Sequence, residues 1–265
     1  MRVRFTKMHG LGNDYLYVYG EVPPDVAELS KKLSDRRFGA GSDGMIFISP
    51  SEKADFSMRI FNADGSEAMM CGNGIRCVGK YVYDKGYTDK TSLRVDTLSG
   101  VKRLELSVSG GRVRTVTVDM GDADVGEELR LGVCGEEILL TPVSVGNPHA
   151  VIFVPDVGHV PVEKLGRAIE KHEAFPGGVN VEFVSVLGAD RLRMRVWERG
   201  SGVTSACGTG ACASVAAAVK KGFCSADRDV AVVLDGGTLT VRADAAGKIV
   251  MTGPAETVYE GETVL

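Results

Sequence analysis

The 265-residue sequence lacks several features that would place it in common functional classes. It has no basic excess, since its net charge is −4, so we expect no positive surface for a nucleic-acid backbone. It contains no apolar run of about 18 residues, which a membrane-spanning helix would need. Its N-terminus lacks the charged and then apolar layout of a signal peptide. These absences predict a cytoplasmic protein that binds neither nucleic acid nor a membrane.

No Cys-x-x-Cys pair occurs among the six cysteines, and the four histidines are scattered. A structural zinc site is therefore not expected, because such sites combine cysteine and histidine at short spacings. A cytoplasmic chain keeps its cysteines as thiols rather than as a disulfide framework. The sequence also carries no sign of a pyridoxal phosphate site. We therefore predict a protein without a metal or a cofactor.

What the sequence does contain is a repeated cysteine turn. It reads Cys71-Gly72-Asn73-Gly74 in the first half and Cys207-Gly208-Thr209-Gly210 in the second. The strand-like sequences at 58–62 and 194–198 are separated by the same interval as the two cysteines, and so are the glycines that follow each cysteine turn, Gly86 and Gly222. So many features at nearly one offset indicate an internal duplication, with a period too long for a solenoid.

The duplication predicts an α+β fold of two pseudo-symmetric domains. Each domain is expected to be a mixed, mostly antiparallel sheet wrapped around a central helix, with the active site in the cleft between the domains. We expect the N-terminal half over residues 1–117 and the C-terminal half over 118–254, with a strand at 255–265 returning to the first half. Helices are predicted at 25–33, 73–85 and 162–170, the first capped by Asp25.

Each cysteine of the repeated turn precedes the start of a predicted helix. The first N–H groups of a helix have no internal partner, and the helix dipole places positive charge there. The pKa of both thiols is therefore expected to fall toward neutrality, and a carboxylate can bind the same N–H groups. With one sulfur on each face of an amino-acid α-carbon, one thiolate can remove the proton while the other thiol returns one. This arrangement indicates stereoinversion, with the helix dipoles stabilising the developing charge.

Further polar residues suit the ends of a bound amino acid. Glu198 can receive an ammonium group, and Arg199 can form a bidentate bond with a carboxylate. His149 follows a Gly-Asn-Pro turn and can assist proton transfer. Asparagine amides both donate and accept, and those in suitable turns are Asn13, Asn62, Asn147 and Asn180. Without further information these asparagines could equally be turn formers.

Taken together, these strings resemble diaminopimelate epimerase. The resemblance rests on the strings at 7–14, 62–66, 71–74, 146–149, 180–182, 198–200 and 207–210. It implies a cofactor-independent isomerase that interconverts LL- and meso-diaminopimelate, on the route to lysine and, in bacteria, to peptidoglycan. It also implies a homodimer.

The resemblance assigns roles to individual residues. Cys71 and Cys207 correspond to the pair that serves as base and acid, and His149 to a histidine near the active site. In some members a glutamine follows the aspartate of the loop after the first helix, where this chain has Gly44. The positions that correspond to substrate-binding ones are Asn13, Asn62, Gly72, Asn73, Asn147, Asn180, Glu198, Arg199, Gly208 and Thr209.

Two other functions stay open at this point. One is a racemase for a different amino acid, such as histidine, on the same scaffold. The other is a non-catalytic thiol redox or ligand-binding protein, in which Cys71 and Cys207 would form a stable disulfide. The remaining cysteines, Cys77, Cys134, Cys212 and Cys224, are expected to be structural.

Overall fold

The computed structural model describes residues 2–264, and the chain divides into two compact units. The first unit runs to Val118 and resumes at Gly253, and the second is Asp119–Thr252. The second unit is thus inserted between two parts of the first. Among residues 2–264 there is no helix with the length and apolar character needed to cross a membrane.

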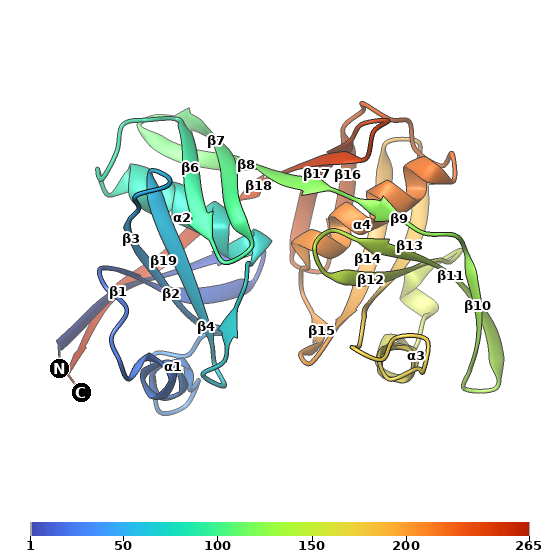
Figure 1. Ribbon diagram of the computed structural model, residues 1–265, viewed down its shortest axis with the longest axis horizontal. Helices are drawn as coiled ribbons and strands as arrows, with labels where there is room; N and C mark the ends of the chain where they lie inside the picture. The colour runs from blue at the N-terminus through green and yellow to red at the C-terminus, as the bar shows by residue number, and fades with distance from the viewer. Residues whose placement is uncertain (1, 265) are drawn as a thin grey trace. The chain divides into compact units, whose positions relative to one another are not determined.

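The first unit is built on strands and two helices within the described part of the chain (Figure 1). Its sheet pairs β19, β1, β2, β3, β4, β6, β7 and β8 in that order, and β5 forms a hairpin with β4. Two of these pairings are parallel, β2 with β3 and β4 with β6, and the others are antiparallel. The elements are β1 (Arg2–Gly10), β2 (Asn13–Tyr19), α1 (Val26–Ser34), β3 (Gly44–Pro50), β4 (Phe56–Asn62), β5 (Glu67–Ala68), α2 (Gly72–Asp84), β6 (Ser92–Thr97), β7 (Gly100–Ser109), β8 (Arg112–Asp122) and β19 (Glu256–Val264).

The second unit repeats this pairing order. Its sheet runs β10, β11, β12, β13, β14, β16, β17 and β18, with β15 as a hairpin on β14 and β9 beside β11. The parallel pairings again fall at the equivalent strands, β12 with β13 and β14 with β16. The elements are β9 (Asp124–Val125), β10 (Leu129–Val133), β11 (Glu136–Ser144), β12 (Pro148–Phe153), η1 (Val157–His159), α3 (Val162–Glu170), β13 (Asn180–Gly188), β14 (Arg191–Glu198), β15 (Gly202–Thr204), α4 (Gly208–Lys220), β16 (Val230–Leu234), β17 (Gly237–Ala243) and β18 (Lys248–Pro254).

The helices follow the offset found in the sequence. Helix α3 begins and ends as far after α1 as Cys207 lies after Cys71, and α4 follows α2 by the same interval. The predicted fold class is therefore confirmed as two halves of mixed sheet with a central helix each. Both central helices end where expected, because Gly86 (φ +75°) and Gly222 (φ +74°) adopt the left-handed conformation that stops a helix.

The central helices are buried because the sheet of each unit curves around them. Nearly every residue of α2 is buried, and α4 is made largely of alanine and glycine, whose small side chains let the strands approach. Helix α2 packs on β1, β2 and β7, and α4 on β11, β13 and β17, among others. This burial fixes the position of each helix start within its own unit (Figure 1).

The outer helices cover the other face of each sheet. Helix α1 packs on β3 and β4, where Leu29 and Leu33 join Met45 and Phe61 in one apolar cluster. Helix α3 packs in the same way on β13 and β14. Asp25 occupies the N-cap position of α1, but its side chain makes no capping hydrogen bond, so the predicted side-chain cap is wrong. The N-cap backbone carbonyl instead accepts from the N–H at position 29.

Candidate active site

The two repeated cysteines are the N-cap residues of the two central helices. Cys71 precedes α2, and its sulfur accepts the N–H of Gly74 at 3.3 Å. Cys207 precedes α4, and its sulfur accepts the N–H of Gly210, also at 3.3 Å. Both cysteines have extended backbone, with φ −137° and −120°. Each sulfur is thus held beside the N–H groups of a helix start, as the sequence predicts.

The glycine at the third position of each central helix is required for different reasons. A Cβ at Gly74 would lie 2.7 Å from Ile46 Cδ1, the end of an apolar side chain. A Cβ at Gly210 would lie 2.6 Å from a carboxylate oxygen of Glu182 and 3.2 Å from the sulfur of Cys207. The second helix start therefore packs directly on a buried acid.

The surroundings of Cys207 raise the pKa of its thiol well above the ordinary value. Burial is the largest cause, and the negative charges of Glu198 and Glu182 add to it. Hydrogen bonds from the Thr209 hydroxyl and the Gly210 N–H act in the opposite direction but are weaker. The prediction that the helix start would lower this pKa is therefore wrong for Cys207, because burial and like charges outweigh the dipole.

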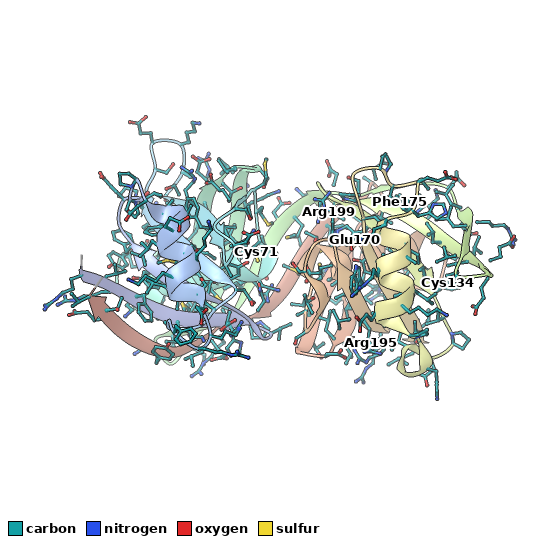
Figure 2. All side chains as sticks on the ribbon, turned by 90° about the horizontal axis from the view of Figure 1, so that it is seen from below. Cys71, Cys134, Glu170, Phe175, Arg195 and Arg199 are labelled. Carbon is teal, nitrogen blue, oxygen red and sulfur yellow. The ribbon has the colours of Figure 1, made fainter. Side chains whose placement is uncertain are left out.

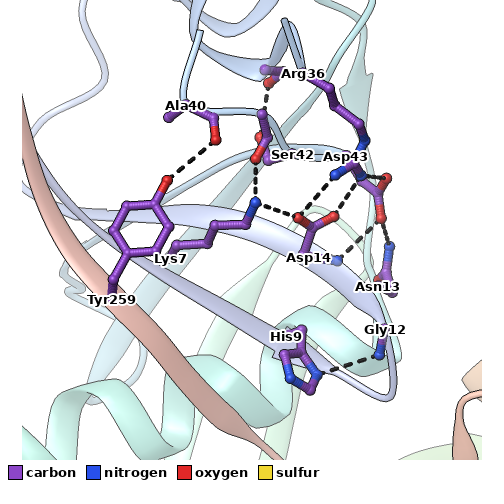
Figure 3. Close-up of polar contacts among 12 residues, drawn as sticks. Lys7, His9, Gly12, Asn13, Asp14, Arg36, Ala40, Ser42, Asp43 and Tyr259 are labelled. Carbon is purple, nitrogen blue, oxygen red and sulfur yellow. Dashed lines mark hydrogen bonds and ion pairs between the residues drawn. The ribbon is translucent and has the colours of Figure 1, made fainter.

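In the first unit, Cys71 is half-exposed and contacts Asn13. The thiol donates to Asn13 Oδ1 at 3.3 Å, while Asn13 Nδ2 donates to Asp43 Oδ2 at 2.7 Å. Asp43 also accepts from Arg36 at 2.8 Å (Figure 3). Because the carboxylate of Asp43 needs a donor, the amide nitrogen of Asn13 faces it and the amide oxygen faces the sulfur.

Asp14 joins this network to the first strand. Burial raises the pKa of its carboxyl, but hydrogen bonds from Arg36 and Lys7 outweigh burial and hold the pKa below its usual value. Arg36 reaches Asp14 at 2.7 Å, and Lys7 reaches it at 2.9 Å (Figure 3). This network of charges holds the turn that carries Asn13. Asp14, Arg36 and Asp43 were not assigned a role by the sequence analysis.

Asn73 and Asn62 differ in their surroundings. Asn73 is buried at the start of α2, and its Oδ1 accepts from Arg76 Nη2 at 3.0 Å. Arg76 is fully buried and also donates to Gly72 O at 3.0 Å, so it braces the first turn of the helix. Asn62 ends β4 and donates to Ser66 Oγ at 3.0 Å.

In the second unit, a chain of hydrogen bonds leads from Cys207 into the core. The sulfur lies 3.5 Å from Thr209 Oγ1, which accepts from Asn147 Nδ2 at 3.3 Å. Asn147 Oδ1 lies 3.0 Å from His149 Nε2, and His149 Nδ1 lies 2.7 Å from Glu182 Oε1. The structure thus brings Cys207, Thr209, Asn147 and His149 together, and adds Glu182 to them.

Asn180, Glu198 and Arg199 lie at the ends of β13 and β14. Asn180 donates to Pro148 O at 3.0 Å and accepts the Arg199 N–H at 3.0 Å, so its amide fixes the backbone beside Arg199. The side chains of Arg199 and Glu170 both belong to the second unit (Figure 2). Glu170 accepts the N–H of residue 200 at 3.0 Å.

Glu198 accepts from the Thr204 hydroxyl. Burial raises the pKa of the Glu198 carboxyl, and the charge of Glu182 adds to this effect. The hydroxyl of Thr204 and a hydrogen bond from the Cys207 thiol act against them. Glu198 is therefore a close neighbour of Cys207.

The four remaining cysteines differ in burial, and Gly44 is limited by the space around it. Cys77 and Cys212 are fully buried inside the central helices and Cys224 is buried, whereas Cys134 is exposed in a left-handed turn and so does not pack in a core. A side chain at Gly44 would meet the carbonyl of Phe61, so the pairing of β3 with β4 leaves no room for one.

A pocket of the first unit lies away from the predicted site. Its volume is about 370 Å³, it is lined by Arg2, Tyr19 and Phe47 among others, and none of its residues belongs to that site. Residues 2–264 contain no group of three or more acidic, histidine and cysteine side chains placed to hold a metal ion.

Comparison with known proteins gives one consistent family. The family model described as "Diaminopimelate epimerase" matches residues 5–125 and 141–258. A diaminopimelate epimerase of Acetivibrio thermocellus is 50% identical, with 99% of each chain covered. One from Bacteroides thetaiotaomicron is 51% identical, with 98% of each chain covered.

Solved structures support the fold at low sequence identity. A hydroxyproline epimerase from Agrobacterium vitis aligns with a TM-score of 0.77 at 19% identity, covering 100% of this chain and 93% of that one. A phenazine biosynthesis protein of the PhzF family from Bacillus anthracis aligns with a TM-score of 0.79 at 16% identity, covering all of both chains.

Proposed function

The chain belongs to the diaminopimelate epimerase family and is an isomerase, and from this premise we propose that it interconverts LL- and meso-diaminopimelate by proton transfer between two thiols. The observation that carries the mechanism is the duplicated helix start, where each cysteine sulfur lies 3.3 Å from a backbone nitrogen in the first turn of its helix. No metal or cofactor takes part in the proposal.

The proposed step inverts one α-carbon without changing the composition of the substrate. A thiolate takes the α-proton and becomes a thiol, and the thiol on the opposite face gives its proton to the carbanion and becomes a thiolate. Cys71 and Cys207 exchange these roles in the two directions of the reaction. The raised pKa of Cys207 favours its protonated form in the free enzyme, so it suits the role of acid there.

The carboxylate beside the reacting carbon needs stabilisation as the proton leaves. We assign this role to the helix-start N–H groups of Gly72 and Asn73 and of Gly208 and Thr209, which lie in the first turns of the helices, at the positive ends of the helix dipoles. These donors are fixed by burial of the helices, so they need little reorganisation in the transition state.

The other end of the substrate carries a second ammonium and carboxylate. We assign its recognition to Asn62, Asn147, Asn180, Glu198 and Arg199, with Asn13 placed beside the Cys71 sulfur. An ammonium group near Glu198 would offset one of the negative charges that raise the pKa of Cys207. Substrate binding would thereby make proton loss from Cys207 easier.

Proton exchange in heavy water tests the proposal. The wild-type protein is expected to convert LL-diaminopimelate to the meso form and to place deuterium at the α-carbon. Cys71→Ala and Cys207→Ala are each expected to lower the rate by at least about 10³-fold, because either change removes one of the two proton carriers. Cys134→Ala, at an exposed position outside the two repeated cysteine turns, is the matched control and keeps the wild-type rate.

Full epimerisation by either active-site variant would disprove the two-thiol mechanism. A panel that includes histidine and other amino acids with one ammonium and one carboxylate decides the substrate. If the protein prefers one of these amino acids, that amino acid replaces diaminopimelate as the proposed substrate. We further propose a cytoplasmic homodimer, which sedimentation of the purified protein and cell fractionation test.

A further inference from the structure

Glu170 lies at the end of the outer helix of the second unit and holds the turn that carries Arg199. It is the last residue of α3, and both of its carboxylate oxygens accept hydrogen bonds. Oε2 accepts the indole N–H of Trp197 at 2.6 Å, and Oε1 accepts the backbone N–H of Gly200 at 3.0 Å. An indole N–H and a backbone N–H can only donate, so this place requires a group with two acceptor oxygens.

The turn between β14 and β15 has Arg199 and Gly200 at its two central positions. The N–H of Ser201 donates to the carbonyl of Glu198 at 3.1 Å, and this bond closes a four-residue turn. Gly200 has φ +77°, as the third residue of a type II turn does. The bond that closes the turn does not use the N–H of Gly200, and this N–H is the one that Glu170 accepts. Glu170 therefore fixes the peptide between Arg199 and Gly200.

The rest of Arg199 is held by contacts on its other side. Its backbone N–H donates to Asn180 Oδ1 at 3.0 Å, and its Nη1 donates to the carbonyl of Gly177 at 3.0 Å. A Cβ at Gly178 would lie 2.9 Å from Arg199 Cδ, so the glycine leaves room for the arginine side chain. Within residues 2–264 the partners of Arg199 include no carboxylate. Its charge is therefore available to a carboxylate of a bound molecule.

The helix that supplies Glu170 is firmly packed in the second unit. Trp197 belongs to the apolar cluster of this unit, and a Cβ at Gly166 of α3 would lie 2.6 Å from Trp197 Cγ. Helix α3 contacts both β14 and β15. Glu170 thus joins a packed helix to an exposed turn. Glu198 has an anchor of its own in the hydroxyl of Thr204, so the effect of Glu170 falls on Arg199.

We propose that Glu170 is a positioning residue that fixes the peptide between Arg199 and Gly200 and so holds Arg199 ready for the second carboxylate of the substrate. The inference rests on the proposed function, in which Arg199 binds the end of the substrate that does not react. A binding group that is ordered in the free enzyme loses less conformational entropy when the substrate binds. Since this end takes no part in proton transfer, the effect is expected in affinity rather than in the chemical step.

Steady-state kinetics of Glu170→Met test this role. Methionine has a similar length but replaces both acceptor oxygens by a weakly accepting thioether. We expect KM for diaminopimelate to rise about 10-fold and kcat to change less than about 3-fold, because binding energy shared by the ground state and the transition state is lost. Glu173→Met, at an exposed acid soon after α3, is the matched control and keeps the wild-type KM. An unchanged KM in Glu170→Met, or a loss confined to kcat, would overturn the inference.

A double-mutant cycle decides whether Glu170 acts through Arg199. Arg199→Met removes the guanidinium and keeps the backbone N–H groups of the turn. Glu170→Met should lower kcat/KM about 10-fold in the wild type but less than about 2-fold in the Arg199→Met background, where the group that Glu170 positions is already absent. Equal losses in the two backgrounds would show a general structural role and contradict the inference.

NMR reads the hydrogen bond of Glu170 without any assay of activity. The chain has one tryptophan, so its ¹H–¹⁵N spectrum contains one indole signal. We expect the indole proton to move upfield in Glu170→Met while the other signals stay dispersed as in a folded protein. An indole signal that does not move would show that the carboxylate is not bound there in solution, and it would overturn the inference.

Glu170→Gln keeps the proposal testable if Glu170→Met does not fold. Its single amide oxygen can serve only one of the two donors, so KM should rise by about 3-fold. In a Trp197→Phe background the indole donor is absent and the amide oxygen can accept the Gly200 N–H, so the same change should leave KM unaltered. A rise that persists in this background would contradict the inference.

The outcome in the wild type separates the two proposals. A wild-type protein without epimerase activity would refute the proposed function. An active wild type whose KM is the same in Glu170→Met would refute only the role of Glu170.

Discussion

The two cysteine turns share a backbone but differ in what surrounds the sulfur. Both sulfurs accept an N–H at 3.3 Å from a buried central helix. Cys71 is half-exposed beside the amide oxygen of Asn13, whereas Cys207 is buried beside Glu198 and a threonine hydroxyl. Duplication therefore preserved the geometry of the helix start and changed the charges around it.

A repeated backbone can thus place two thiols in unlike surroundings. The helix dipole acts alike on both thiols, so it cannot distinguish them. Burial and the carboxylates of Glu198 and Glu182 raise the pKa of Cys207. Cys71 instead lies beside the amide of Asn13. The side chains around Cys207, rather than the turn itself, set its proton affinity.

The largest difference between the two turns is expected at the paired glycines, Gly74 and Gly210. Gly210→Ala is expected to lower activity by at least about 100-fold and the free energy of unfolding by about 2–3 kcal/mol, because its Cβ would displace the buried carboxylate of Glu182. The Cβ of Gly74→Ala would meet the side-chain ends of Ile46 at 2.7 Å and Met58 at 3.2 Å, which can shift more easily than a buried carboxylate, so its losses should stay below about 10-fold and about 1 kcal/mol.

Steady-state kinetics and denaturant unfolding measure both variants. Both variants place alanine at the third residue of a central helix, so both gain the same helix propensity. A difference between their losses therefore reports the side chains that surround each glycine. Equal losses in the two halves would contradict this contrast.

Removal of one charge near Cys207 is expected to make its thiol more acidic. Glu198→Gln removes a like charge, so the pKa of Cys207 is expected to fall and its thiolate to form at lower pH than in the wild type. The difference in ultraviolet thiolate absorbance between each protein and its Cys207→Ser form measures this titration. Glu137→Gln, at an exposed carboxylate in the same unit, is the control and should leave the titration unchanged. An unchanged titration in Glu198→Gln would remove Glu198 as a cause.

The smallest expected effect on activity concerns the outer helices. Ser30 and Gly166 occupy equivalent positions of α1 and α3 under the offset of the duplication. A Cβ at Gly166 would lie 2.6 Å from Trp197 Cγ, so Gly166→Ala should lower the free energy of unfolding by about 2–3 kcal/mol. Ser30 donates to Phe61 O at 3.0 Å, and Ser30→Ala should cost about 1 kcal/mol. Denaturant unfolding distinguishes the two, and we expect kcat to change less than about 3-fold in either variant. A greater cost for Ser30→Ala would reverse the expected order.

The sequence predicts the helices well because local signals mark both ends. The helices expected at 73–85 and 162–170 form at or next to those bounds, since glycine stops the first and the duplication supplies the second. It does not reveal the hairpin of β10 and β11. In the first unit the equivalent strand β1 pairs with β19 instead, so the two units complete this edge of the sheet in different ways.

The residues of the candidate site also differ in whether a local sequence signal marks them. Cys71 and Cys207 stand out because a local motif repeats, and that motif places both at helix starts. Asp43 and Glu182 acquire their contacts through strand pairing, so their spacing in the sequence carries little signal. The one local sign that Glu182 has a special place is that it is an acid among mostly apolar residues at 179–186. The proton affinity of Cys207 also depends on distant residues, which explains why reasoning from the helix start alone failed.

The pairing of β1 with β19 has a consequence for synthesis on the ribosome. β1 is made before the second unit, whereas β19 (Glu256–Val264) is made after it. All of the second unit emerges before β19, so that unit can fold while one edge of β1 is still open. Such an edge can pair with other chains, and the nascent first unit is therefore exposed to misassembly until β19 emerges.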